Sequence, residues 1–210
     1  AQAQTTAPAA KETTLPPIKV QAQAESGGKE AYQATETRIG KGVQELRDVP
    51  QSITVVTEKL IDDRNLDTLK DALKNTAGIS FQAAEGGEED IRLRGFSLQS
   101  TGDIFIDGMR DPAFYERDSF NWDRLEVLRG SASLLFGRGS TGGAVNQVSK
   151  QPRLVPRNEI TLGIDDAEIV RATGDFNVPT GDNAAFRVNT IVQTGERDGI
   201  KVDRRGIAPT

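Results

Sequence analysis

The chain has 210 residues, a formal net charge of −5 and a composition that is 36% hydrophobic and 5% aromatic. It contains neither Cys nor His, which excludes zinc sites built from those residues, cysteine nucleophiles and histidine general bases. The negative charge offers no electrostatic footprint for a nucleic-acid partner. The low apolar content indicates that part of the chain is disordered, or that part of its apolar surface belongs to another structure.

Residues 1–31 are rich in Ala, Gln, Thr, Pro and Glu and hold few large apolar side chains. Such a segment cannot bury enough surface to offset the entropy of ordering, so we expect it to be disordered. Within it, Ile18 and Val20 alternate with Lys19 in T-L-P-P-I-K-V-Q-A, which Pro17 keeps out of a helix. On composition alone this segment is a linker.

The following residues predict short helices and strands. Ile53 and Val55 alternate as in a strand, and Thr57 is a predicted N-cap for the helix after it. Asn65 is expected to cap a second helix, which Gly78 ends. We also expect strands at 79–81, 90–96 and 104–106, a solvated acidic loop at 82–90, a polar loop at 97–103 and a turn at Asp107–Gly108.

Residues 124–150 hold the densest pattern, R-L-E-V-L-R-G-S-A-S-L-L-F-G-R-G-S-T-G-G-A-V-N-Q-V-S-K. They predict a strand, a short helix at 132–136 capped by Ser131, a glycine loop at 137–143 and a second strand at 144–149. The glycines indicate positive φ or close approach by another segment. The loop contains G-x-G-x-x-G, but it follows a helix and precedes a strand. A dinucleotide fingerprint has the opposite order, so we reject a nucleotide site.

A loop after the predicted turn combines two cations with two aromatic rings: Arg110, Phe114, Tyr115 and Arg117. Cations and aromatic faces complement an anionic, aromatic ligand. The alternative is a structural loop in which Phe114 packs inward.

Beyond Pro152 the pattern changes to long alternating segments separated by turns. Ile160 and Leu162 share one face, and Phe186, Val188 and Thr190 share another. Segments of about ten alternating residues are typical of outer-membrane β-barrels. We expect three such strands, a number that cannot close a barrel.

Five motifs, in this order, carry a family resemblance: V-P-Q-S-I-T-V-V, R-L-R-G-F, I-F-I-D-G-M-R-D, L-E-V-L-R-G and F-G-R-G-S-T-G-G-A-V-N. Together they resemble the plug domain of TonB-dependent outer-membrane receptors, specifically the siderophore-receptor branch. Members usually carry Pro where this chain has Ser131. The resemblance implies a ferric-siderophore importer of the bacterial outer membrane, in which the plug blocks the barrel lumen and an N-terminal TonB box pairs with the periplasmic protein TonB.

The resemblance also implies residue roles. Arg94 and Arg129 match plug arginines that contact acidic groups on the barrel wall, where a planar guanidinium suits carboxylates. The TonB box, which adds a strand to TonB, is Thr14, Leu15, Pro16, Pro17, Ile18, Lys19 and Val20. The apical loops that reach the ligand hold Gln99, Arg110, Phe114, Tyr115 and Arg117.

The expected fold class is α+β. A disordered tail at 1–31, with the TonB box at 14–22, precedes a plug domain at 32–152 with a mixed four-stranded sheet and short helices. Residues 153–210 are expected to begin an antiparallel barrel of about 22 strands.

The expected partners are TonB, energised by its inner-membrane partners, a ferric siderophore as transported ligand, the chain's own barrel and outer-membrane lipid. No resident cofactor, metal site, nucleic-acid partner or enzymatic activity is expected. The alternative function is an isolated periplasmic ligand-binding module that ends near Pro152. Catecholate, hydroxamate and mixed siderophores all remain open as ligands.

Overall fold

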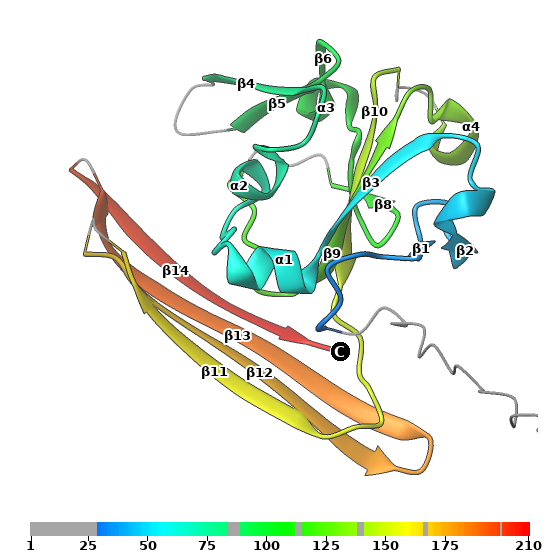
Figure 1. Cartoon of the computed structure of the whole chain (residues 1–210). Coiled ribbons are helices and arrows are strands. Elements are labelled where there is room, and N and C mark those ends of the chain that lie inside the picture. Colours follow the sequence, from blue (N-terminus) through cyan, green and yellow to red (C-terminus); the bar gives the residue numbers. More distant parts are fainter. Residues whose placement is uncertain (1–28, 84–88, 112–114, 138–140, 166–167, 198) are drawn as a thin grey trace, which may run out of the picture.

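The structure is a computed structural model that describes residues 29–83, 89–111, 115–137, 141–165, 168–197 and 199–210. It has two parts, an N-terminal unit (residues 29–150) and a curved sheet of four strands (residues 157–209) whose concave face lies against that unit (Figure 1). The predicted TonB box lies outside the described residues. None of the helices in these ranges is long and apolar enough to cross a membrane.

The elements of the N-terminal unit are all short. Its helices are α1 (Glu58–Asp63), α2 (Leu69–Leu73), α3 (Leu98–Thr101) and α4 (Ser133–Phe136), with a 3-10 helix at Leu46–Asp48. Its strands are β1 (Glu36–Thr37), β2 (Gln44–Glu45), β3 (Ser52–Thr57), β4 (Ile79–Ala83), β5 (Glu89–Leu93), β6 (Phe96–Ser97), β7 (Ile104–Ile106), β8 (Met109–Arg110), β9 (Trp122–Arg129) and β10 (Gly143–Ser149).

The main sheet of the unit is mixed, as expected, with the strand order β3-β9-β10-β7-β8. Strand β9 runs antiparallel to β3 and β10, whereas β7 runs parallel to β10. The two-residue strand β8 extends the sheet beyond the four strands that the sequence predicted. Strands β4, β5 and β6 form a separate small sheet.

Strand β9 places its apolar residues on both faces of the sheet, and residues 125–128 are buried. Leu125 and Val127 pack into a core shared with α1, α2, α3 and β5, while Leu128 packs on the other face against Ile39, Phe105 and other apolar residues. The side chains of Leu125, Val127 and Leu128 are all fully buried. The L-E-V-L-R-G motif therefore forms the strand to which both cores attach.

Glu126, also fully buried, joins separate segments through its carboxylate. It accepts hydrogen bonds from the backbone N–H of Arg38 at 2.8 Å, from Arg124 Nε at 3.0 Å and from Asn146 Nδ2 at 3.2 Å. Asn146 in turn accepts from the N–H of Gly108 at 2.9 Å. A buried carboxylate with these partners is satisfied, so it fixes the N-terminal segment, two strands and the turn in one arrangement.

The helix caps agree with the sequence in one case and differ in another. Thr57 caps α1 as predicted, because its hydroxyl accepts from the N–H of Leu60. The prediction that Asn65 caps the second helix is wrong: α2 begins at Leu69 and its N-cap is Thr68, whose hydroxyl accepts from the N–H of Asp71. Asn65 instead adopts φ 48° after α1, a left-handed conformation that Asn tolerates better than most residues.

Two further local predictions need correction. The predicted polar loop at 97–103 contains α3, which Ser97 caps and which ends at Gly102 with φ 70°. Ser131 does not cap α4: the N-cap position is Ala132, and the Ser131 hydroxyl contacts the Ser133 hydroxyl at 3.0 Å. The turn at Asp107–Gly108 is confirmed, with positive φ at both residues.

The curved sheet consists of β11 (Arg157–Ile164), β12 (Val170–Gly181), β13 (Ala184–Arg197) and β14 (Ile200–Pro209), paired antiparallel in chain order. The sequence predicted three strands and missed β14. Its apolar residues Val202 and Ile207 lie on opposite faces, separated by Asp203, Arg204, Arg205 and Gly206. This spacing breaks the alternation that identifies a strand.

The two faces of the curved sheet differ in chemistry. By register, Ile160, Leu162, Phe186 and Val188 lie on the same face, not on two faces as the sequence pattern suggested. Ile160, Leu162 and Phe186 are exposed there by 67%, 75% and 49%. The residues between them point to the N-terminal unit, and they include Arg171, Arg187 and Arg204. Alternation of this kind is expected of a strand with lipid on one side and a polar lumen on the other.

Gly143, at the start of β10, has φ 142° and packs where no side chain fits. A Cβ built at this position would lie 2.1 Å from the Leu128 carbonyl oxygen and 2.6 Å from Leu93 Cδ2. The neighbouring Gly142 would meet the Leu93 carbonyl oxygen at 2.5 Å. These described residues of the glycine loop are therefore small because the two sheets of the N-terminal unit meet there.

We predict that Gly143→Ala destabilises the protein by about 3 kcal/mol or more, because the backbone must shift to relieve both clashes and the new residue is strained. Urea unfolding followed by fluorescence of the single, buried Trp122 measures the change. Gly42→Ala is the control, since nothing lies within 4 Å of its Cβ and a change within about 0.5 kcal/mol is expected. Equal stability of the two variants would contradict the prediction.

Candidate functional site

Arg110, predicted to contact ligand, joins two helix ends in the structure. Its guanidinium donates to the carbonyl oxygens of Thr101 at 3.1 Å, Gly102 at 3.0 Å and Phe136 at 3.0 Å. It also lies 5.6 Å from the centre of the Phe105 ring. The side chain remains exposed, so its charge faces solvent while its described hydrogen bonds hold the ends of α3 and α4 together.

Arg117 and Tyr115 form one unit with Asp111. Arg117 is only 1% exposed and donates through Nε to the Asp111 carboxylate at 2.7 Å. Its guanidinium lies 4.5 Å from the centre of the Tyr115 ring, and the Tyr115 hydroxyl donates to Asp111 at 3.0 Å. Burial and the bond to Asp111 raise the pKa of Tyr115, so the phenol keeps its proton. Tyr115, which is 43% exposed, therefore presents a supported ring to solvent.

Two other predicted ligand residues lie elsewhere or cannot be placed. Gln99 is 5% exposed, and its Oε1 accepts from the N–H of Ile91 at 2.8 Å. Its Nε2 is buried and has no hydrogen-bond partner among the described residues. Phe114 lies outside the described residues. The structure thus brings Tyr115 and Arg117 together, with Arg110 on the strand that leads into the loop and Gln99 on α3.

Arg94 and Arg129, expected to contact the barrel wall, bond locally within the described residues. Arg129 donates to the Ala77 carbonyl at 2.9 Å and to the Ser52 hydroxyl at 3.3 Å. Arg94 adopts φ 55° and its N–H donates to the Gly78 carbonyl at 2.8 Å. Neither forms an ion pair with β11–β14 in this part of the chain, so their predicted contact with the wall stays a prediction.

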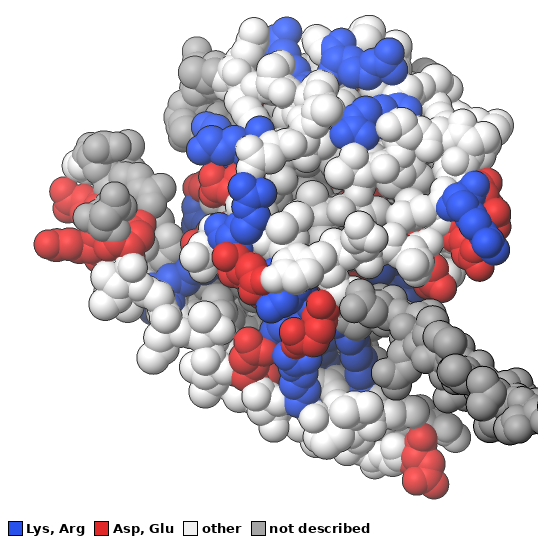
Figure 2. All heavy atoms as spheres, viewed as in Figure 1, with Lys and Arg blue, Asp and Glu red and all other residues white. Residues whose placement is uncertain are grey.

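The described ion pairs between the N-terminal unit and the curved sheet instead have both polarities: Glu58 and Asp118 of the unit face arginines of the sheet. Lys29 and Lys150 of the unit face Glu159 and Asp175. Figure 2 shows red and blue side chains mixed along the line where the two parts meet. The contacts form two clusters, which we name after their central carboxylates, the Glu58 cluster and the Asp118 cluster.

The Glu58 cluster gathers three cations around one buried carboxylate. Glu58 is 3% exposed and lies 3.2 Å from Lys150, 3.5 Å from Lys29 and 3.9 Å from Arg187. Lys150 and Arg187 also pair with Asp175 of β12. Neither Glu58 oxygen has a hydrogen-bond partner among the described residues, so the nearby positive charges compensate this carboxylate.

The residues just after the undescribed tail attach to this cluster. Lys29 donates to Glu159 of β11 at 2.7 Å and lies 3.4 Å from Asp62. Burial lowers its pKa, but Glu159, Glu58 and Asp62 outweigh that effect and the net pKa is raised. Glu30 pairs with Arg157 at 3.0 Å, and Tyr32 hydrogen-bonds Asp63. Lys29 and Glu30, which the sequence assigned to the tail, are therefore held against α1 and β11.

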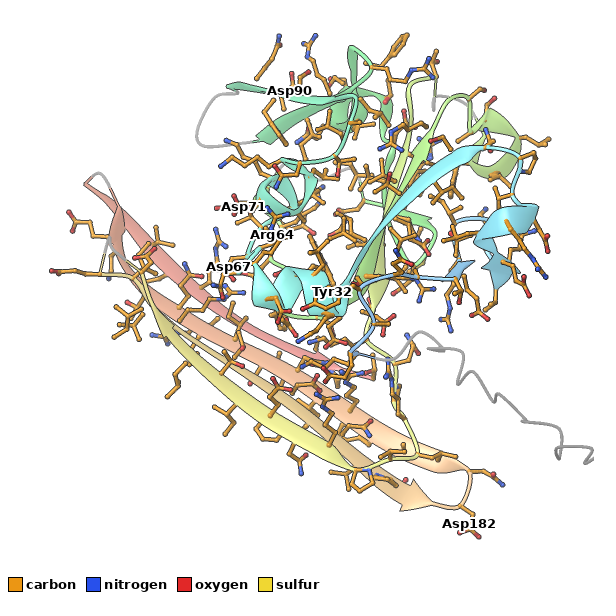
Figure 3. All side chains as sticks on the ribbon, viewed as in Figure 1. Tyr32, Arg64, Asp67, Asp71, Asp90 and Asp182 are labelled. Atoms are coloured by element: carbon orange, nitrogen blue, oxygen red, sulfur yellow. The ribbon has the colours of Figure 1, made fainter. Side chains whose placement is uncertain are left out.

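The Asp118 cluster lies at the end of the loop that holds Tyr115. Arg171 of β12 binds both Asp118 oxygens, each at 2.7 Å, and Arg204 of β14 donates to the same carboxylate at 3.1 Å. Arg204 also pairs with Glu116, and Arg171 lies 3.2 Å from Asp67. Asp67 lies on the side of α1 and α2 that faces the curved sheet (Figure 3). Its pKa is raised chiefly by burial, to which Asp118 and Asp71 add and which Arg171 and Arg204 oppose.

No sequence pattern predicts either cluster directly. The available signal was the position of Arg171, Arg187 and Arg204, which alternate with the outward-facing residues of their strands. A cation at an inward position of a wall strand indicates a carboxylate opposite, but it does not identify which one.

We predict that Lys150→Met destabilises the protein by about 3 kcal/mol, because it removes one partner of the buried Glu58 and leaves that carboxylate less compensated. Lys201→Met is the control, since Lys201 pairs with Asp203 at 3.0 Å but is 76% exposed, and exposed pairs contribute less than about 1 kcal/mol. Urea unfolding monitored at Trp122 compares the two. A Lys150 variant as stable as the Lys201 variant would refute the prediction.

Asp67 provides a test of the electrostatics by pH. Because its folded-state pKa is raised, the folded protein binds this proton more tightly than the unfolded chain, and the residue's contribution to stability falls as pH rises through that pKa. Asp67→Asn is therefore expected to be more stable than the parent at about pH 7, with the difference vanishing near pH 3. The exposed turn residue Asp182 (Figure 3) supplies the control, Asp182→Asn. An Asp67→Asn variant that is less stable than the parent at neutral pH would contradict the prediction.

Comparison with known proteins agrees with this architecture. Residues 45–144 match the TonB-dependent receptor plug domain. The chain is 35% identical over 201 residues to a probable TonB-dependent receptor, BfrD, of Bordetella pertussis, covering 93% of this chain and 26% of that protein. The chain thus spans about a quarter of the length of this curated relative.

Solved structures give the same result. The siderophore receptor PiuA from Acinetobacter baumannii is similar with a TM-score of 0.78 at 33% identity, over 86% of this chain and 26% of that one. The closed form of the ferric-catecholate import receptor Fiu from Escherichia coli also gives 0.78 at 33% identity, over 85% of this chain and 26% of the other. With its mixed sheet packed on the polar face of antiparallel wall strands, the chain belongs to the TonB-dependent receptor family and carries the plug domain of that family.

Proposed function

We propose that this chain is the plug and the first wall strands of an outer-membrane receptor that imports a ferric siderophore with energy supplied through TonB. The observation that carries the proposal is the packing of the N-terminal unit on the polar, arginine-bearing face of the curved sheet, whose other face exposes apolar side chains along β11, β12 and β13. A plug inside a lumen and lipid outside it require this division. A complete barrel of about 22 strands surrounds the plug in this proposal.

The alternative, an isolated periplasmic binding module, is not favoured. That module would end near Pro152, whereas this chain continues into four long strands. Its relatives are named as receptors, including a catecholate siderophore receptor, Fiu, of Escherichia coli. The resemblance of the chain to receptors rather than to enzymes supports a transport function in which no bond is broken.

Within the proposed site, the exposed ring of Tyr115 and the exposed charge of Arg110 are the direct ligand contacts. An aromatic ring and a cation suit an anionic complex that carries aromatic groups. Arg117 supports the Tyr115 ring. Gln99, which is 5% exposed, and Phe114, which lies outside the described residues, stay predicted ligand residues. Arg94 and Arg129 are proposed to face wall strands beyond the four described here.

The experiment measures binding and uptake by the complete receptor in cells, with radioactive iron carried by a catecholate, by ferrioxamine or by pyoverdine. We expect saturable binding of at least one complex, and uptake that requires TonB. Failure of all three complexes to bind would refute the siderophore assignment. Uptake that persists in cells without TonB would refute the coupling.

A variant in the proposed TonB box separates the two steps. Ile18→Pro removes a backbone N–H from a segment that must pair as a strand, so we expect uptake to be lost while ligand binding is retained. Ile18→Val is the control, because it keeps the backbone and the apolar side chain, and it should transport normally. Normal uptake by Ile18→Pro would show that the box lies elsewhere.

A further inference from the structure

The loop that holds Tyr115 is attached to the N-terminal unit at both ends. At its start, the N–H of Asp111 donates to the Ile104 carbonyl at 2.8 Å. At its end, the Arg117 carbonyl accepts from the N–H of Leu69, and the N–H of Ser119 donates to the Asp67 carbonyl, both at 3.0 Å. These bonds fix where the loop begins and ends, but they do not determine which side chains face outward.

The direction of the side chains follows from their alternation. Glu116 and Asp118 contact arginines of the curved sheet, while Tyr115 and Arg117 stack on each other and share Asp111. Along residues 115–118 the side chains therefore alternate between two sides, as they do in an extended strand. Holding positions 116 and 118 against the sheet therefore turns positions 115 and 117 the other way.

Asp118 makes the strongest of these contacts. Both of its oxygens bind Arg171 at 2.7 Å, which is the bidentate geometry that gives an arginine–carboxylate pair its strength and direction. Arg171 is oriented in turn by Gln193 of β13 at 2.8 Å, and Arg204 adds a contact from β14. The Asp118 side chain is 11% exposed, so water screens these charges weakly. Strands β12 and β14 thus contact this carboxylate directly, and β13 orients one of its partners.

We propose that Asp118 is a positioning residue for ligand recognition: its bidentate pair with Arg171 fixes residues 115–118 against the wall and thereby orients Tyr115 toward the ligand. The statement about ligand recognition rests on the proposed function, whereas the statement that Asp118 fixes the loop does not. The pair also makes the wall strands part of the binding site, although Arg171 does not touch the ligand.

Hydrogen exchange and ligand binding test the proposal in the complete receptor. In Asp118→Asn the loop loses its fixed state, so amides of residues 111–120 should exchange about tenfold faster or more, while those of β9 and β10 remain unchanged. If the competent loop is then populated about one tenth of the time, the affinity for the iron(III) complex of dihydroxybenzoate falls about tenfold. Arg171→Gln should show the same changes, and the double variant should be no worse than either single variant.

Two control variants should leave exchange and affinity unchanged: Asp182→Asn in the β12–β13 turn, and Arg205→Gln, which is exposed beside Arg204. Should Asp118→Asn fail to fold, Arg171→Lys keeps the charge but loses the bidentate geometry and should reproduce the loop change in part. Unchanged exchange in the loop, or additive effects of the two single variants, overturns the proposal. If the unmodified receptor binds no ferric complex, the siderophore assignment fails while the exchange measurement still decides the role of Asp118.

Discussion

A charge removed from water must find an opposite charge, and this requirement governs how the two parts of the chain meet. The curved sheet places Arg171, Arg187 and Arg204 on the face toward the N-terminal unit. The N-terminal unit places the carboxylates of Glu58 and Asp118 opposite these arginines, and their side chains are 3% and 11% exposed. Because removing one partner of such a pair is costly, the clusters determine the register of the unit on the sheet.

An interface built from ion pairs differs from an apolar one in what happens when it opens. Apolar surfaces lose their stabilisation when water enters, whereas separated carboxylates and arginines regain hydration that offsets much of the lost attraction. A small polar cavity of about 40 Å³ beside Lys29, Asp62, Lys150 and Glu159 is roomy enough for a water molecule. The contact between unit and sheet is thus specific in register without the adhesion of a hydrophobic core, which is compatible with the plug rearrangement that the proposed transport requires.

How far the sequence predicted this structure depends on the range of the interactions involved. Strand β9 and the Thr57 cap were predicted, because strand alternation and N-caps are local signals. The cap at Thr68 was assigned to Asn65 three residues earlier, since both residue types favour caps and only tertiary packing decides between them. Strand β14 was missed because its outward face carries Asp203 and Arg205 among few apolar residues.

The candidate site was less predictable than the fold. The family resemblance located Tyr115 and Arg117 in one loop, but composition could not show that Arg117 would be 1% exposed and bound to Asp111. Pairs such as Asp118 with Arg171 join residues more than fifty positions apart. A single sequence, read without an alignment, does not show which distant residues are in contact. For contacts with the wall, the resemblance implied only Arg94 and Arg129. The described ion pairs are made by other residues and have both polarities, with acids of the plug on arginines of the sheet and Lys29 and Lys150 on acids of the sheet.

The segment from Glu58 to Leu69 contacts both the residues that follow the tail and the loop that holds Tyr115. Its first half, helix α1, holds Lys29 and Tyr32 at the end of the tail, and its second half bonds the loop through Asp67 and Leu69. A helix of six residues is too short to be stable alone and depends on its tertiary contacts. Loss of contacts at one end of this segment therefore weakens the element that supports the other. Adjacency alone does not establish coupling, but here the shared element is marginal by its length, and Lys29 and the loop that holds Tyr115 bind to opposite ends of it.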